Sequence, residues 1–477
     1  MTVLILLAVP LAGALALSRL TGRAAAIAHT ATGGLALAAA AGVAVVVTSG
    51  PVTALGGVLR ADGLSAWMAT LICLVAALAG TEAGRYAPFS SPGRFYPLWH
   101  LFVFTMLLAV TTDDVGLMWV AIEGTTLASV FLVNFERTRT SLEAAYKYLL
   151  ICSVGIALAF LGTLLVYFAD LQQLAPTGDH PLRWTALLQI APALDGGVVR
   201  LAFAFLIVGY GTKAGLVPMH TWLPDAHSEA PAPVSALMSG VLLSVGVYAL
   251  MRFRPIVELA AGARFAADVL VGFGLASMAV AAAFLWRPGN YKRMLAYSSV
   301  EHMGIVCLGL GFGGPWGIAG ALLHIGNHAL AKSVLFLMAG RIRAAYGSAD
   351  LDAVRGLLRA LPGTGRGFLL AMLALMGVPP FGLFVSEVMI FVAAFRAGFV
   401  VVPLAGAAFL VVAFAGMLRA LHGMLYGLPR AVAAGASPPW GGAGPVAAAL
   451  ALLLLTGLAW PPGLETALGH VASLVGR

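Results

Sequence analysis

Two histidines and a lysine recur at steps of four in the apolar stretch LLHIGNHALAKSVLF, as His324, His328 and Lys332. On an α-helix, a step of four turns about 40° past a full turn and rises about 6 Å, so the three side chains line one face over about 12 Å. Imidazole, with a pKa of about 6.5, both accepts and donates protons near neutral pH. Three polar residues could instead join helices by hydrogen bonds alone, but the triplet favours a proton relay.

Further ionisable residues lie within apolar stretches: Glu123 in MWVAIEGTTLASVFLV, Lys213 just before AGLVPM, and Glu387 in FVSEVMIF. A Lys or Asp near the centre of a membrane helix costs about 2.5–3.5 kcal/mol, so such residues are rare unless they are paired, hydrated or functional. If Glu123 and Lys213 pair, each stabilises the charge of the other. Glu301 and His302, in AYSSVEHMGIV, either join the same path or form a local polar pair.

The elements that must position these residues are membrane helices. Of the 477 residues, 61% are hydrophobic and only 10% are charged, which is typical of a polytopic membrane protein. We expect an all-α chain of about fourteen spanning helices. The first apolar stretch lacks a basic leader, so we interpret it as a spanning helix rather than a signal peptide. The expected helices begin near residues 2, 25, 62, 97, 114, 145, 199, 231, 263, 292, 316, 367, 399 and 445.

The positive charge is distributed as in a membrane protein. The net charge is +8, but the Lys and Arg residues lie at the ends of apolar segments rather than in a basic stripe, which argues against binding to nucleic acid. The first, third, fifth, ninth and eleventh connections are rich in Arg and Lys. Most even-numbered connections are poor in them, although the eighth, with Arg252, Arg254 and Arg264, is an exception. The positive-inside rule therefore places the odd connections in the cytoplasm and both termini on the outer side of the membrane.

Two of the expected helices carry breakers, at Pro218 and at Pro379 and Pro380. Broken helices at corresponding positions of two halves are typical of transporters built from inverted repeats, although ordinary proline kinks give the same pattern. The loop after the first break holds His220, Asp225 and His227. The spacing of these residues fits no usual zinc site, so we expect a hydrogen-bonded structural loop and no metal.

No cofactor site is expected in this chain. Cys73, Cys152 and Cys307 are far apart and lie in apolar segments, so they have no cluster-ligand spacing. The glycines of GLGFGG, residues 309 to 314, end an apolar helix and do not join a strand to a helix, so we interpret this dinucleotide-like pattern as a false positive.

The stretches GTKAGLVPMHTWLPDAHSEAPAPVSALMSGVLL, YKRMLAYSSVEHMGIV and HIGNHALAKSVLF resemble the antiporter-like proton-channel subunits of respiratory complex I and group 4 hydrogenases. Within that family the chain is most similar to hydrogenase-4 component F. The resemblance implies two inverted five-helix repeats, each with a broken helix and a half-channel. It divides the chain into N-terminal helices (1–96), a first repeat (97–254), a second repeat (255–427), and a link with a last helix (428–477).

The resemblance also implies roles for the titratable residues. Glu123 matches the ion-pair glutamate of the family and Lys213 the lysine that this glutamate modulates. His324, His328 and Lys332 match the central relay, and Glu387 the outlet residue. At Ser244, many family members carry a second lysine instead, so the connection from Lys213 to the histidines must rely on water and on this serine.

The resulting hypothesis is a non-catalytic membrane subunit that translocates protons, while partner subunits of a hydrogenase-4-like or complex I-like (NADH dehydrogenase-type) oxidoreductase perform the redox chemistry. The alternative is a subunit of a cation/proton antiporter or of a proton-driven inorganic-carbon uptake system, without redox coupling.

Overall fold

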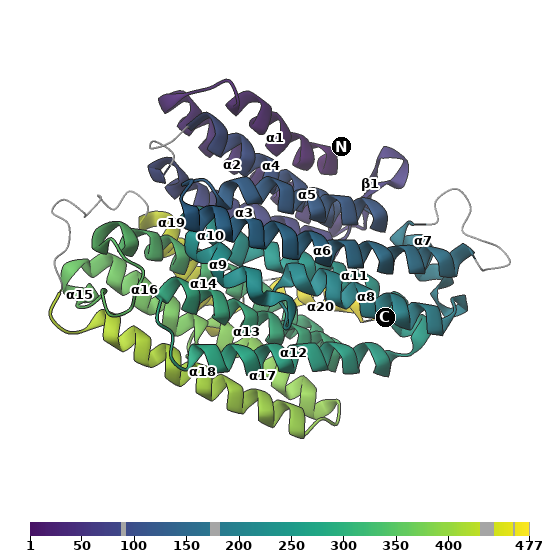
Figure 1. Ribbon diagram of the computed structural model, residues 1–477. Coiled ribbons are helices and arrows are strands. Elements are labelled where there is room, and N and C mark those ends of the chain that lie inside the picture. Colours follow the sequence, from purple (N-terminus) through teal and green to yellow (C-terminus); the bar gives the residue numbers. More distant parts are fainter. Residues whose placement is uncertain (87–91, 172–181, 430–442, 461–462, 477) are drawn as a thin grey trace.

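The computed structural model describes residues 1–86, 92–171, 182–429, 443–460 and 463–476. Within these ranges the chain is a bundle of roughly parallel helices with one small hairpin (Figure 1). The hairpin pairs β1 (Val52–Ala54) with β2 (Leu59–Ala61) in antiparallel register, Val52 opposite Ala61. We call the end of the bundle that carries β1 and α7 the hairpin end, and the end that carries α15 the opposite end. Both termini lie toward the hairpin end (Figure 1).

The helices begin close to the expected positions, and the all-α polytopic prediction is confirmed. The largest difference is at α6, which begins at Arg139 where 145 was expected. The bounds are α1 Thr2–Leu17, α2 Gly22–Val47, α3 Gly63–Tyr86, α4 Pro92–Thr111, α5 Val115–Val133, α6 Arg139–Leu171, α7 Trp184–Ile190, α8 Gly196–Ala214, α9 Trp222–Glu229, α10 Ala232–Leu237, α11 Leu243–Ala261, α12 Ala263–Leu285, α13 Tyr291–Phe312, α14 Gly314–Tyr346, α15 Leu357–Ala360, α16 Pro362–Leu375, α17 Gly382–Arg396, α18 Val401–Leu425, α19 Ala443–Leu458 and α20 Leu464–Val475.

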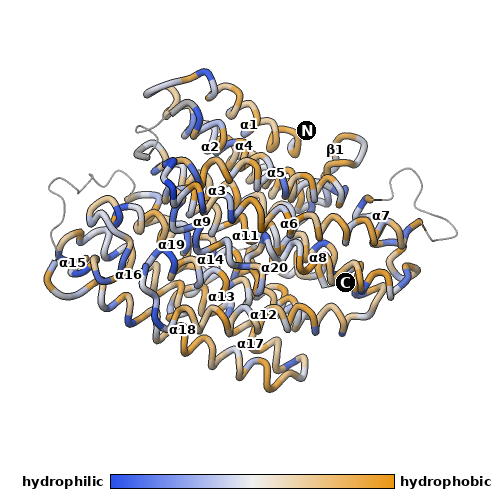
Figure 2. Tube along the Cα trace, in the orientation of Figure 1, coloured by the Kyte–Doolittle hydropathy of each residue, from blue (hydrophilic) through white to orange (hydrophobic). Residues whose placement is uncertain are grey.

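Among the described residues, 11 helical segments are long and apolar enough to cross a membrane. The pairs α8–α9 and α10–α11 each count as one such segment. The other three expected spans are α1 and the interrupted pairs α16–α17 and α19–α20, whose pieces are shorter. Hydrophobic residues cover most of the long helices, whereas the short helix α9 and several helix ends are hydrophilic (Figure 2). The segments α10–α11 and α14 are buried along their whole apolar windows, so they form the centre of the bundle.

Both predicted breaks are present, and each follows a glycine in the left-handed conformation. Helix α8 ends at Ala214 and is followed by Gly215 (φ 75°) before Pro218, and α16 is followed by Gly377 (φ 65°) before Pro379 and Pro380. Glycine reaches this conformation without a Cβ clash, and proline has no N–H with which to continue a helix.

The backbone groups freed by the first break find partners inside the protein. The Trp222 indole donates to the Thr212 carbonyl at 2.9 Å, and the Val217 N–H donates to Ser277 Oγ at 3.1 Å. Irregular backbone is tolerated at membrane depth only with such internal partners or beside water.

The last apolar segment is divided, whereas a single helix was expected. Helix α19 ends at Leu458 and α20 begins at Leu464. Thr456, near the end of α19, donates to Asn327 Oδ1 in the middle of α14 at 2.8 Å, and Val475, at the end of α20, accepts from Arg254. Helix α20 therefore lies along the half of α14 nearer the hairpin end. Its outward side is polar and exposed, with Glu465, Thr466, His470 and Ser473.

Buried ion pairs fix both ends of the bundle. At the hairpin end, Arg252 of α11 makes two 2.7 Å hydrogen bonds to Asp62, which precedes α3. Burial alone raises the pKa of the Asp62 carboxyl, but the charge and hydrogen bonds of Arg252 outweigh it, so this pKa lies well below its ordinary value. At the opposite end, Arg341 pairs with Glu82 of α3 at 2.5 Å. Helix α14 continues past this buried pair to Tyr346.

Candidate proton-relay site

The first group of polar side chains surrounds Lys213, which lies fully buried in the last turn of α8. Its Nζ donates to Thr126 Oγ1 and to the Tyr148 hydroxyl, both at 2.9 Å. Thr126, one turn along α5 from Glu123, donates to Glu123 Oε2 at 3.2 Å. The expected glutamate–lysine pair is therefore joined through a hydroxyl group.

Helices α5 and α6 complete this first network with three more hydroxyl contacts. Ser153 of α6 donates to Glu123 Oε1 at 2.8 Å. The hydroxyls of Tyr148 and Ser129 lie 2.7 Å apart, and Ser129 is also 2.6 Å from the Thr125 carbonyl. The Lys213 ammonium lies 5.0 Å from the centre of the Tyr148 ring. Because hydroxyl groups both donate and accept, this network can pass a proton between the two charged residues.

The loop after the first break divides into a structural part and a buried part. Asp225 accepts from Lys147 of α6 at 3.2 Å and pairs with Arg293 of α13 at 2.9 Å, so it ties α9 to two neighbours. This arrangement suits the structural role expected of Asp225. His220 is largely buried, and its ring lies 6.1 Å from that of Tyr297.

His227 occupies a different environment from the rest of this loop. It is fully buried, and within the described ranges neither ring nitrogen has a hydrogen-bond partner. Its ring lies 5.1 Å from the ring of Phe336 on α14, and it is close enough to Lys332 and Lys292 for their charges to act on it. His227 therefore lies toward the second half of the protein.

Ser244 is the other residue expected between the halves. It is fully buried in α11, and its Oγ has no hydrogen-bond partner among the residues that the structure describes. Helix α11 packs closely on α8, where a Cβ at Gly246 would meet backbone atoms of Tyr210 and Ala214. Ser244 therefore lies on a helix that packs beside the end of α8 where Lys213 is located. Its hydroxyl makes no hydrogen bond to Lys213 or to Lys332.

The second group centres on α14, where His324, His328 and Lys332 are all fully buried. The three lie on one helix as expected, but their nearest polar contacts run to α13 and not along the ladder. Lys332 Nζ donates to the Leu295 carbonyl and to Ser298 Oγ, both at 2.5 Å. The rings of His302 and His328 lie 5.2 Å apart. The candidate path therefore alternates between α13 and α14.

The hydrogen bonds around His324 and His302 indicate which ring nitrogen of each carries a proton. Ser386 Oγ of α17 donates to the Leu383 carbonyl at 2.8 Å, so it accepts from His324 Nδ1 at 2.9 Å. His324 Nε2 is then an acceptor, and His302 Nδ1 donates to it at 2.8 Å. His302 is therefore hydrogen-bonded to His324 and does not form a local pair with its neighbour Glu301.

Glu301 and Glu387 line a cavity of about 200 Å³ together with His302 and residues of α16 and α18. Both carboxylate oxygens of Glu301 lack a hydrogen-bond partner within the described ranges. Glu387 packs against Gly377, where a Cβ would overlap its carboxylate. The second break thus makes room for this acidic side chain beside a space large enough for water.

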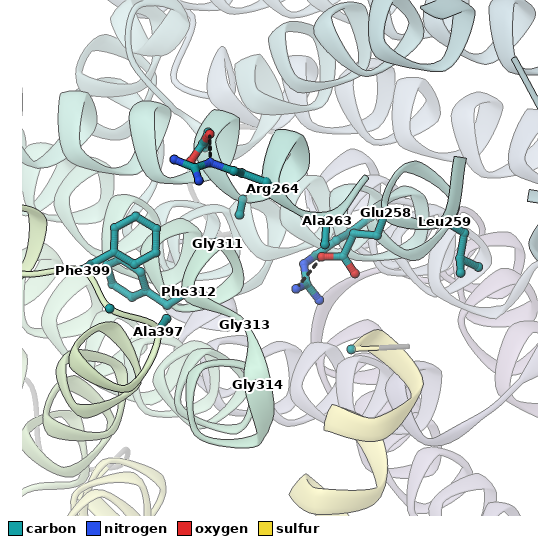
Figure 3. A pocket seen from close by; sticks show the side chains of 15 residues that line it. Glu258, Leu259, Ala263, Arg264, Gly311, Phe312, Gly313, Gly314, Ala397 and Phe399 are labelled. Atoms are coloured by element: carbon teal, nitrogen blue, oxygen red, sulfur yellow. Dashed lines mark ion pairs between the residues drawn. The ribbon is translucent and has the colours of Figure 1, made fainter. Parts of the chain in front are cut away.

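A separate apolar cluster lies next to the cavity on the side of the hairpin end, one to two turns further along α13 and α17. It contains Ile305 and Leu308 of α13, Ile390 and Ala393 of α17, and Val271 of α12. Beyond it, an open cleft of about 840 Å³ is lined by the ends of the same helices (Figure 3). The ion pairs Arg254–Glu258 and Arg264–Asp268 lie along this cleft, and the rings of Phe312 and Phe399 lie 5.2 Å apart at its side. We call the apolar cluster the outer plug.

Several polar contacts of the site were missed at the level of sequence, namely Thr126, Ser129, Tyr148, Ser153, Ser298 and Ser386. Thr126 could have been found, because it lies three residues from Glu123 on the same helix and so shares its face. The others depend on how different helices meet, which the spacing of residues does not reveal.

Comparison with known proteins places this geometry in a family. Residues 112–413 match the family described as NADH:quinone oxidoreductase/Mrp antiporter, transmembrane. The chain is 39% identical over 353 residues to the hydrogenase-4 component F homolog of Methylacidiphilum infernorum (isolate V4), covering 73% of each chain.

Two solved structures share the whole fold. A subunit of the archaeal membrane-bound sulfane sulfur reductase superposes with a TM-score of 0.90 at 22% identity, covering 100% of this chain and 98% of that one. A subunit of respiratory complex I from Thermus thermophilus with bound aureothin gives a TM-score of 0.79 at 29% identity, covering 96% and 98%. These matches confirm the resemblance inferred from the sequence, including its similarity to hydrogenase-4 component F. The chain belongs to the family of antiporter-like membrane subunits shared by NADH:quinone oxidoreductases and Mrp antiporters.

Proposed function

We propose that this chain translocates protons across the cytoplasmic membrane of a prokaryote, as a non-catalytic subunit of a redox-driven complex of the hydrogenase-4 or complex I type. The observation that carries the proposal is the succession of titratable and hydroxyl side chains across α5, α8, α9, α14, α13 and α17 at bilayer depth. Charged residues in that position are costly, and their retention favours an ion pathway.

The proposed path begins at Glu123 and passes through Thr126 to Lys213. From there, water beside Ser244 and His227 connects to Lys332. The path continues through His328, His302 and His324 to Glu387, and Glu301 faces the same cavity. We assign residues 97–254 and 255–427 to the two halves of this path, and residues 1–96 and 428–477 to contacts with other membrane subunits. By the positive-inside rule, the hairpin end with both termini faces outward.

The alternating contacts suit a relay better than they suit binding of a substrate. Each histidine can accept a proton at one nitrogen and release one from the other, and each hydroxyl can reorient. The steps without a direct hydrogen bond require water. They run from Lys213 through His227 to Lys332, from Lys332 through His328 to His302, and from His324 to Glu387. Wetting of these steps, driven by a partner subunit, would couple the chain to redox chemistry.

Proton flux into vesicles tests the proposal. The purified complex that contains the chain is reconstituted with a pH-sensitive dye inside, and flux is driven by a potassium diffusion potential. Lys213→Met and Glu123→Gln should each abolish the flux. Lys147→Met and Glu143→Gln change the same residue types at an exposed ion pair of 2.6 Å and should leave the flux intact. Full flux in Lys213→Met and Glu123→Gln would limit these residues to a packing role.

The second candidate function is cation/proton exchange without electron transfer, which the family match to Mrp antiporters favours. In the same vesicles, a sodium gradient without any electron donor would then drive proton movement. Proton movement that needs a donor, and that is indifferent to sodium, selects the redox-coupled function.

A further inference from the structure

We propose that His302, His324 and Glu387 form a binding site for a divalent transition-metal ion, with Zn²⁺ as the best match, in the wall of the Glu387 cavity. One nitrogen of each histidine and one carboxylate oxygen all lie within 4.8 Å of one another. Metal binding here goes beyond the proposed function. Its consequence, that the bound ion blocks the relay, rests on that function.

The donor set selects the class of metal. Two imidazoles and one carboxylate are the ligands that zinc accepts, at about 2.0–2.2 Å, with a fourth position left for water or another oxygen. Calcium and magnesium take oxygen ligands and would leave both imidazoles unused. Ligand atoms at the corners of such a tetrahedron are about 3.3–3.5 Å apart. His302 Nδ1 and His324 Nε2, now 2.8 Å apart, would need to separate by about half an ångström.

The contacts behind His324 prepare it to bind a metal. Ser386 accepts the proton of His324 Nδ1, since the serine hydroxyl itself donates to Leu383. The lone pair of His324 therefore lies on Nε2, which faces His302. Histidine ligands usually donate their other N–H to such an acceptor, which fixes the tautomer and the orientation of the ring. A metal ion would displace the proton that His302 now shares with His324.

Glu301 supplies the second, independent observation. It is almost completely buried, yet both of its oxygens lack a hydrogen-bond partner among the described residues, and it lines the same cavity as His302 and Glu387. Two carboxylates close enough for their charges to act on each other would be matched by a divalent cation. The cavity, of about 200 Å³, leaves room for the water molecules that would complete the coordination.

Equilibrium binding tests the site without any measurement of activity. The full-length chain, purified in its complex with the affinity tag removed, is titrated with Zn²⁺ in competition with a chromophoric chelator. One saturable site is expected, and X-ray absorption of the bound zinc should show two imidazole nitrogens and oxygen ligands. His302→Ala and Glu387→Gln should each weaken binding by more than about 100-fold, beyond the effect of losing a supporting residue.

Ser386→Ala is a second variant that tests the site if His302→Ala or Glu387→Gln fails to fold. It keeps all three ligands and removes only the acceptor behind His324, so binding should weaken by about 10- to 100-fold. His422→Ala and Glu465→Gln, which remove exposed groups of the same types, should leave the affinity unchanged. Unchanged affinity in both His302→Ala and Glu387→Gln, or the absence of saturable binding, would overturn the site.

Flux measurements separate this inference from the proposed function. In the wild-type complex, Zn²⁺ should inhibit potential-driven proton flux over the same concentration range in which it binds. Binding that requires the three ligands but leaves flux intact would uphold the metal site and place the proton path elsewhere. In Ser386→Ala, which keeps every residue of the proposed path, inhibition should require about 10- to 100-fold more Zn²⁺. An unchanged inhibitory concentration in this variant would assign the zinc effect to another part of the protein.

Discussion

Glu123 and Lys213 are joined by a single hydroxyl group, that of Thr126, which accepts from Lys213 Nζ at 2.9 Å and donates to Glu123 Oε2 at 3.2 Å. This contact has a direction, because Thr126 has only one proton to give. If the proton of Lys213 moves to Thr126, the proton of Thr126 moves to Glu123. The hydroxyl thus makes transfer between the two charged residues a concerted step.

Replacing Thr126 by valine should therefore interrupt the first half of the path. The substitution keeps the shape of the side chain but leaves the buried Lys213 short of one acceptor, a loss of about 1.5–3 kcal/mol for a hydrogen bond to a charged group. If the step limits the rate, flux should fall by about 10- to 100-fold. Dye-reported flux in vesicles measures it. Thr126→Ser restores the hydroxyl and should restore the flux; equal flux in Thr126→Val and the wild type would remove the hydroxyl from the path.

His227 should prove more important than its loop position suggests. It is buried beside Phe336 and within reach of the charge of Lys332, so it is the described side chain best placed to carry a proton from the first half to the second. His227→Leu should lower flux by about tenfold or more, the effect of at least 1.4 kcal/mol. His220→Leu, a histidine of the same loop that faces Tyr297, is the matched control and should have little effect. Similar losses in both variants would point to damage of the loop itself.

The outer plug should close the route from the Glu387 cavity to the cleft at the hairpin end when no partner drives the chain. Its residues are apolar and buried, and such constrictions hinder water and ions by remaining dry. Leu308→Ser should admit water and raise the passive proton leak of resting vesicles by about tenfold, which corresponds to a barrier lower by about 1.4 kcal/mol. Leu308→Ile preserves the apolar volume and should not leak. If Leu308→Ser does not raise the passive proton leak, protons leave the cavity by another route.

Asp62 should contribute more to stability than any exposed acidic residue of the same end. Asp62→Asn leaves the buried Arg252 charge without its partner, which costs about 3–5 kcal/mol. Thermal unfolding of the purified protein in detergent measures the loss. Asp268→Asn removes a partner from the exposed Arg264 pair, where at most about 1 kcal/mol is expected.

The same pair sets a pH dependence. Because the pKa of Asp62 is lower in the folded than in the unfolded protein, its contribution is complete above the unfolded value of about 3.9 and is lost as the pH falls toward the folded value. Stability of the wild type should therefore decline in acid, and the difference between the wild type and Asp62→Asn should shrink there. A difference that is constant from neutral to acid pH would contradict this account.

Much of the fold could be predicted because membrane helices can be recognised in a sequence by their length and apolar character. The breaks at Pro218 and Pro379 were also predictable, since each combines glycine with proline inside an apolar stretch. The division between α19 and α20 was missed, although the sequence WPPG at residues 460 to 463 carries the same signal.

For the site, the sequence supplied the charged residues but not their connections. Periodicity placed His324, His328 and Lys332 on one face, yet the contacts run to His302 and Ser298 on α13. Which helix lies opposite depends on the packing of the whole bundle, and the spacing along one helix carries no information about it. His227 was grouped with its loop for the same reason: nothing in the local sequence indicates that its ring turns toward α14.

The outward side of α20 carries polar side chains that are exposed in the described part of the bundle. Glu465, Thr466, His470 and Ser473 face away from the bundle, while Leu468, Val471 and Ala472 pack inward. Polar groups at this depth are unfavourable against lipid tails and favourable against another protein helix. The exposed side of α20 is therefore better suited to contact with another protein helix than to contact with lipid tails, so a copy without such a neighbour should be less stable in the membrane.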